Sequence, residues 1–204
     1  MNAVLVTVML SIGLAVIVVR RRSVGILLLA AQSLALGVIA IGLAGGHSGE
    51  FLIAGVLLAK AVVLPALLYL LIRRTPEASL VLAAAGPIVR LAAAGAAALC
   101  AVLLVPPLGL GAPHTEHAAF ALVLVGIAIV VLRRPILFQL LGLIVAENGL
   151  SLLAVSVPGG LSYVVEFGAL FDLALIVTVA AAFAQRIHTD LGTGDTELLR
   201  GLRD

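Results

Sequence analysis

The chain has 204 residues, of which 63% are hydrophobic and only 11% are charged. Its mean hydropathy of +1.31 excludes an ordinary soluble globular protein and predicts an integral membrane protein. The 12 Lys and Arg residues nearly balance the 10 Asp and Glu residues, so neither a nucleic-acid surface nor an acidic partner is indicated. The single cysteine, Cys100, excludes an internal disulfide and is interpreted as a small buried residue.

A membrane-spanning helix needs about 20 apolar residues. Seven stretches qualify, at residues 3–19, 23–44, 51–72, 87–106, 117–132, 136–157 and 161–185. The first stretch ends in three arginines without a small-residue cleavage site, so we expect an uncleaved span rather than a signal peptide. Pro87 should break the long apolar run in which it lies, and Arg90 should then extend its side chain to the membrane interface.

Basic residues follow alternate spans only. They follow the first, third, fifth and seventh spans, as Arg20, Arg21, Arg22, Arg73, Arg74, Arg133, Arg134 and Arg186. Lys and Arg are absent from the intervening loops, so the positive-inside rule places the N-terminus outside, the C-terminus in the cytoplasm and an odd number of spans between them. We therefore predict an all-α, polytopic membrane protein with seven transmembrane helices in this orientation.

The sequence contains a possible internal repeat, because residues 18–74 align with residues 130–186 without gaps. The charged positions that superpose are Arg21 on Arg133, Arg22 on Arg134, Arg74 on Arg186, and Lys60 on Asp172. Four spans separate equivalent helices, so the two copies must cross the membrane in the same direction. The predicted organisation is a three-helix unit at 1–74, a linking helix with loops at 75–116, a parallel three-helix unit at 117–186 and a cytoplasmic tail at 187–204.

Four ionisable residues lie inside predicted spans: Lys60, Glu147, Glu166 and Asp172. Each costs about 2.5–3.5 kcal/mol at a helix centre unless it pairs, takes up a proton or meets water. Counting about 1.5 Å per residue from the inner helix ends places all but Glu166 near the midplane. One interpretation is a row of protonatable groups, as proton pumps require, and the other is a set of fixed ion pairs that specify packing.

Helical spacing predicts a polar seam around Glu147. Gln139, Glu147 and Ser151 fall on one stripe, with Asn148 beside it, and this stripe should face protein or water rather than lipid.

A second polar group, His114, Glu116 and His117, lies in the predicted outer loop at 106–117. A flexible, solvated loop explains it better than a metal or proton-collecting site. The sequence shows no phosphate-binding loop, nucleophile constellation or redox-centre motif, so we expect no catalysis and no cofactor in this chain alone.

The stretch RRPILFQLLGLIVAENG, residues 133–149, resembles the K subunit of respiratory complex I and the C subunit of multisubunit sodium/proton antiporters. The chain is more similar still to component E of hydrogenase 4. That family also has seven spans, an ENG motif like Glu147-Asn148-Gly149, an acid pair on the last helix like that in VVEFGALFD at 164–172, and a tail like LGTGDTELLRGLRD at 191–204. The resemblance covers the whole chain, and its specific part is confined to 133–204.

This resemblance implies that the midmembrane glutamate of the K subunit falls at Ile144, one helical turn before Glu147. The last-helix glutamate of the K subunit falls approximately at Asp172. It also implies a proton relay in which Glu147 and Asp172 are protonatable stations, Lys60 is their charge partner and Glu166 is a link toward a neighbour.

The resemblance further implies a membrane subunit of a group 4 nickel–iron hydrogenase complex, in a bacterial or archaeal cytoplasmic membrane. Its partners would be antiporter-like subunits and the membrane anchor of the hydrogenase arm, with the nickel–iron and iron–sulfur centres in partner subunits. Three alternatives stay open: a subunit of a cation/proton antiporter without a hydrogenase, a passive membrane scaffold whose charges are all paired, and a stand-alone transporter.

Overall fold

The computed structural model describes residues 3–43, 48–74, 86–106, 109, 113–157 and 176–178. Its elements are the α-helices α1 (Ala3–Val18), α2 (Arg22–Leu43), α3 (Ser48–Arg74), α4 (Pro87–Leu104), α5 (Pro113–Leu132) and α6 (Ile136–Ser156). Five of them, α2 to α6, are long and apolar enough to cross a membrane, and α1 is a shorter apolar helix. The all-α, multi-pass membrane class is therefore confirmed. The predicted span at 161–185 lies outside the described residues, apart from a helical segment at 176–178.

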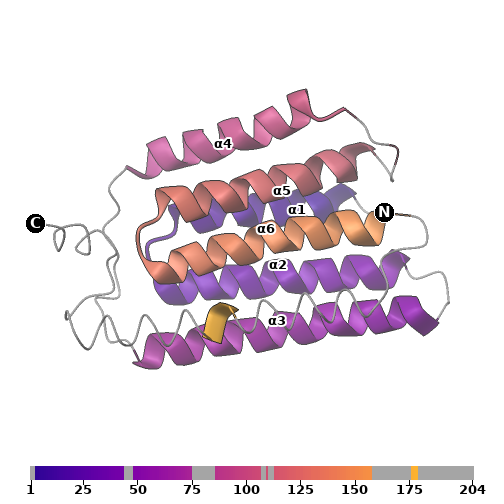
Figure 1. Ribbon diagram of the computed structural model, residues 1–204, viewed down its shortest axis with the longest axis horizontal. Helices are drawn as coiled ribbons and strands as arrows, with labels where there is room; N and C mark the ends of the chain where they lie inside the picture. Colours follow the sequence, from indigo (N-terminus) through magenta and orange to yellow (C-terminus); the bar gives the residue numbers. More distant parts are fainter. Residues whose placement is uncertain are drawn as a thin grey trace, which may run out of the picture.

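Four helices form the centre of the bundle (Figure 1). In this centre α1 packs on α2 and α5, and α6 packs on the same two helices from the other side. The helix α3 flanks α2, and α4 flanks α5 and α1. The hairpins α1–α2 and α5–α6 run in the same direction (Figure 1). The division into two three-helix units stays a prediction, because the third helix of the second unit lies outside the described residues.

Glycines let the backbones of α5 and α6 come into direct contact. A Cβ atom on Gly126 would lie 2.5 Å from the main-chain nitrogen of Ala146 and 2.6 Å from the main-chain oxygen of Gly142. Small residues of this kind allow close helix packing in lipid, where no hydrophobic effect drives helices together. At 3.6 residues per turn, Glu147 points about 140° away from Gly142 around α6. The α5 contact therefore turns Glu147 toward the opposite side of α6.

The α4 helix begins at Pro87, where proline fits because the first turn of a helix needs no amide donor. Arg90 does not extend outward from the bundle, because its side chain turns inward toward the end of α1. Arg90 is 1% exposed, and its Nη1 donates a hydrogen bond to the Ile17 carbonyl oxygen at 2.8 Å. The last carbonyls of a helix have no partner within it, so the end of α1 offers acceptors inside the bundle.

The predicted outer loop is also shorter than expected, because α5 begins at Pro113 rather than at residue 117. His114, Glu116 and His117 therefore lie in the first turns of a helix, and describing them as a flexible loop is wrong. Proline at the first position is preorganised for a helix, and the Glu116 carboxylate is favoured near the positive end of the helix dipole. Glu116 is buried, and the His117 ring Nε2 lies 3.1 Å from the Val105 oxygen. Among the described residues, no group of three or more potential metal ligands is found.

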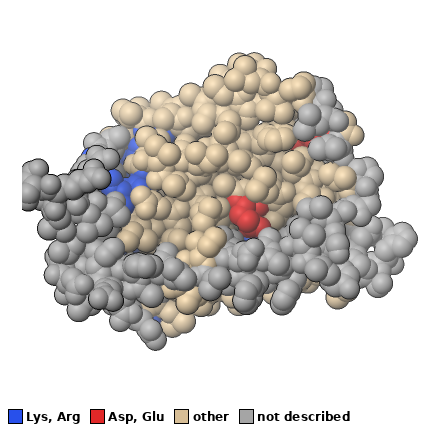
Figure 2. All heavy atoms as spheres, in the orientation of Figure 1, with Lys and Arg blue, Asp and Glu red and all other residues tan. Residues whose placement is uncertain are grey.

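The described arginines gather at one end of the bundle. At this end α1, α3 and α5 finish and α2, α4 and α6 begin (Figure 1). Figure 2 shows the blue basic atoms of the described residues at the same end, and red acidic atoms in the middle of this face. This is the charge distribution that the positive-inside rule requires of a multi-pass protein. Assigning that end to the cytoplasm stays a prediction.

Candidate functional site

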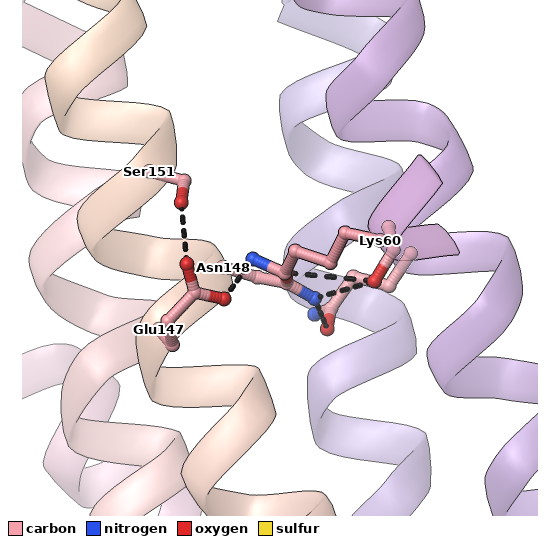
Figure 3. Close-up of polar contacts among 6 residues, drawn as sticks. Lys60, Glu147, Asn148 and Ser151 are labelled. Carbon is pink, nitrogen blue, oxygen red and sulfur yellow. Dashed lines mark hydrogen bonds and ion pairs between the residues drawn. The ribbon is translucent and has the colours of Figure 1, made fainter. Parts of the chain in front are cut away.

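The middle of the bundle holds an ion pair between two helices that are far apart in sequence. The Nζ of Lys60, on α3, contacts Oε2 of Glu147, on α6. Figure 3 shows the long Lys60 side chain reaching across from α3 to the carboxylate. Ser151 lies one turn further along α6, and its hydroxyl donates a hydrogen bond to Oε1 of Glu147 at 2.8 Å. Both oxygens of the carboxylate therefore have a partner.

The two members of the pair differ in exposure. The Lys60 side chain is 2% exposed and the Glu147 side chain is 17% exposed. Figure 2 shows acidic atoms, in red, at the surface in the middle of one face of the bundle. Glu147 is therefore the more accessible member of the pair. Protonating Glu147 removes the charge that holds Lys60, so the protonation of one side chain and the position of the other are coupled.

A second polar cluster lies in the central four helices, next to the ion pair along α6. The Asn148 Nδ2 donates to Gln32 Oε1 at 3.0 Å and to the Ser33 hydroxyl at 3.2 Å. Gln32 in turn donates from Nε2 to the main-chain oxygen of Met9, on α1, at 2.9 Å. A Cβ atom on Gly13 would lie 3.3 Å from the Gln32 Nε2, so the missing side chain leaves room for this amide. Polar contacts therefore link α1, α2 and α6.

Buried polar groups need partners in an apolar interior, and this cluster supplies them. Asn148, Gln32 and Ser33 are each no more than 1% exposed. Sequence reasoning missed Gln32 and Ser33. The available signal was two adjacent polar residues in the apolar run of α2, but nothing in the sequence showed that α2 packs against α6.

The remaining predicted site residues are placed as follows. Gln139 lies about 12 Å from Glu147 along α6 and is half-buried, and within the described part of the chain its side chain makes no hydrogen bond. Ile144, the position implied by the K subunit, is fully buried in the apolar core. Glu166 and Asp172 lie outside the described residues. The structure thus brings Lys60, Glu147 and Ser151 together, while Asn148 turns to α2.

Comparisons with known proteins add one partial similarity. No protein-family model matches the chain, and no solved structure matches it. A stretch of 87 residues is 32% identical to the uncharacterized protein Rv0085 of Mycobacterium tuberculosis. That stretch covers 43% of this chain and 40% of the mycobacterial protein. The chain is therefore similar to less than half of that protein.

Proposed function

We propose that this chain is a membrane subunit of a group 4 nickel–iron hydrogenase or a related complex I-like assembly, and that it contributes to proton or cation translocation coupled to electron transfer. The observation that carries the proposal is the ion pair between Lys60 and Glu147 in the middle of the bundle. Intramembrane charges are expensive and mark ion or proton pathways by default. The ENG motif that includes Glu147, and the wider resemblance to component E of hydrogenase 4, point to the same kind of complex.

In the proposed relay, Glu147 exchanges its lysine partner for a proton. When the carboxylate is ionised, it holds the Lys60 ammonium and accepts the Ser151 hydroxyl. A proton arriving at Glu147 neutralises it and releases Lys60 to interact with the next acidic group. Asp172 and Glu166 are the proposed further stations, as the family resemblance implies. The subunit would itself bind no nickel or iron–sulfur centre, since these belong to partner subunits in such complexes.

Glu147→Gln tests this role, because glutamine keeps the shape of the side chain and cannot ionise. We expect proton translocation by inverted membrane vesicles, measured per assembled complex, to fall to background, while the complex that assembles still turns over hydrogen. Glu116→Gln is the matched control, because Glu116 is another buried acid but lies in the first turn of α5. Wild-type translocation in an assembled Glu147→Gln complex would contradict the proposal.

The main rival assigns the same pair to a cation/proton antiporter without a hydrogenase, and the similarity of residues 133–149 to antiporter C subunits favours it. Affinity purification of the tagged chain separates the two. A nickel–iron large subunit and stoichiometric nickel in the purified complex support the hydrogenase assignment. Antiporter-like subunits without nickel support the antiporter. A stand-alone transporter would instead transport ions after reconstitution of this chain alone.

A passive scaffold is the other rival, since the ion pair could serve only to fix α3 against α6.

The proposed localisation is the cytoplasmic membrane of a bacterium or archaeon, with the arginine end of the bundle in the cytoplasm and the N-terminus outside. Antiporter-like subunits and the membrane anchor of the hydrogenase arm are the proposed neighbours.

A further inference from the structure

Two arginines from other helices cap the C-terminal end of α1. The Arg90 Nη1 donates to the Ile17 oxygen at 2.8 Å, and the Arg133 Nη2 donates to the Val19 oxygen at 2.9 Å. The Arg133 Nη1 also approaches the Ile17 oxygen, at 3.4 Å. The carbonyls at the end of a helix carry only a partial negative charge, equivalent to about half an electron. Arg90 and Arg133 are called the arginine pair below.

The arginine pair is buried and carries more positive charge than its surroundings neutralise. Arg90 is 1% exposed and Arg133 is 0% exposed. Burial, together with a smaller repulsion from Arg90, lowers the pKa of Arg133 to about 10, so the guanidinium is still a cation at neutral pH. The guanidinium carbon atom of Arg133 lies 3.5 Å from the centre of the Phe138 ring. Two full positive charges therefore face only the partial negative charges of the α1 carbonyls and of the Phe138 ring.

The hydrogen bonds of the pair are also incomplete. The Nε atoms of both Arg90 and Arg133 are buried and find no hydrogen-bond acceptor among the described residues. Within the described part of the chain, neither guanidinium is paired with a carboxylate. Buried polar atoms almost always find a partner, and a buried charge without a counter-charge is costly. Within the described residues, the arginine pair therefore has two unsatisfied donors and no anionic acceptor.

We propose that the arginine pair binds a phosphate group, carried by an anionic phospholipid or present as free phosphate. The planar guanidinium fork matches phosphate oxygens, and basic sites between transmembrane helices bind lipid headgroups. The pair lies where α4 and α6 begin and α5 ends, which is the level at which headgroups meet a membrane protein. This assignment does not depend on the proton relay.

The test uses the purified full-length chain in nanodiscs of phosphatidylcholine. We expect phosphatidylglycerol in the nanodisc to raise the thermal unfolding midpoint by about 5 °C or more, because a ligand that binds only the folded state stabilises it. Arg90→Gln should lose this rise. Arg73→Gln should keep it, because Arg73 is an exposed arginine at the same end that stacks on Tyr69. A rise of the same size with inorganic phosphate in phosphatidylcholine nanodiscs would identify free phosphate as the source.

Native mass spectrometry of the wild-type chain keeps the proposal testable if Arg90→Gln does not fold. Preferential retention of phosphatidylglycerol over phosphatidylcholine supports the lipid as ligand. The proposal is overturned if neither phosphatidylglycerol nor phosphate raises the midpoint of the wild-type chain. It is equally overturned if Arg73→Gln loses the rise as completely as Arg90→Gln.

Discussion

The ion pair between Lys60 and Glu147 predicts that replacing its two members lowers the stability of the protein by unequal amounts. Glu147→Gln removes the carboxylate that faces Lys60, whose side chain is only 2% exposed. Removing one member of a buried pair costs about 3–5 kcal/mol when the remaining charge is poorly solvated. Lys60→Met leaves a carboxylate that is 17% exposed and still accepts the Ser151 hydroxyl, so its cost should be about 1–3 kcal/mol.

The double variant Lys60→Met with Glu147→Gln removes both charges at once. Replacing a buried pair by neutral groups of similar shape is often neutral or stabilising. We therefore expect the double variant to be at least about 1 kcal/mol more stable than Glu147→Gln alone, which is a non-additive result for residues in contact.

The free energy of unfolding is measured in mixed micelles by titration with a denaturing detergent, with the loss of helix followed by circular dichroism. The wild type, the two single variants and the double variant together form a double-mutant cycle. Ser151→Ala is the control for a lost hydrogen bond from a neutral hydroxyl to the same carboxylate, with an expected cost of about 1.5–3 kcal/mol. The reasoning is refuted if the stability losses of the two single variants add up to the loss of the double variant, or if Lys60→Met lowers the stability more than Glu147→Gln does.

Three further predictions concern the rest of the bundle. Asn148→Leu removes the amide that joins α6 to α2, and the same titration should show a loss of about 1–3 kcal/mol; a loss below about 0.5 kcal/mol would contradict the importance of this cluster. Gly126→Ala places a Cβ atom 2.5 Å from a main-chain nitrogen of α6, so it should lower the free energy of unfolding by about 1–3 kcal/mol or more. At Gly95 an added Cβ atom meets open space, so Gly95→Ala should change the free energy of unfolding by no more than about 0.5 kcal/mol. Equal losses for Gly126→Ala and Gly95→Ala would contradict the close packing of α5 on α6. With the native cysteine removed, an impermeant maleimide should label Arg73→Cys from the cytoplasmic side and His114→Cys from the outside, and the reverse pattern would refute the orientation.

The helices could be predicted from sequence because lipid leaves the backbone few choices. A chain in hydrocarbon must satisfy its own amide groups, so each apolar run of sufficient length becomes a helix, and the arginines mark where runs end. The departures from expectation lie mainly at helix ends. Cys100 is a further one, because it was interpreted as buried and is exposed on α4. Arg90 turns inward because the last carbonyls of α1 are available, and α5 starts early because Pro113 and Glu116 favour a helix N-terminus. The Ile17 acceptor of Arg90 is 73 residues away and is not visible in a local window of sequence, whereas Pro113 and Glu116 are local signals that sequence reasoning missed.

Part of the candidate site could be predicted from helical geometry alone. Glu147 and Ser151 are four residues apart on one helix, so their contact follows from helical geometry. Counting residues from the arginine end predicts only that Lys60 and Glu147 lie at a similar depth, which is a condition for their ion pair. Gln32 could not be predicted as a neighbour of Asn148, because the sequence does not show which helices pack together. Its acceptor is a main-chain oxygen of Met9, which no side-chain pattern reveals.

The most direct test of the central claim is the proton yield per hydrogen turned over by the assembled complex carrying Lys60→Met and Glu147→Gln together. The double variant keeps the bundle neutral at the site, so assembly and hydrogen turnover should match the wild type. If the ion pair carries protons, the yield falls to background. A wild-type proton yield from the assembled double variant would contradict this claim and leave the pair as a fixed packing contact between α3 and α6.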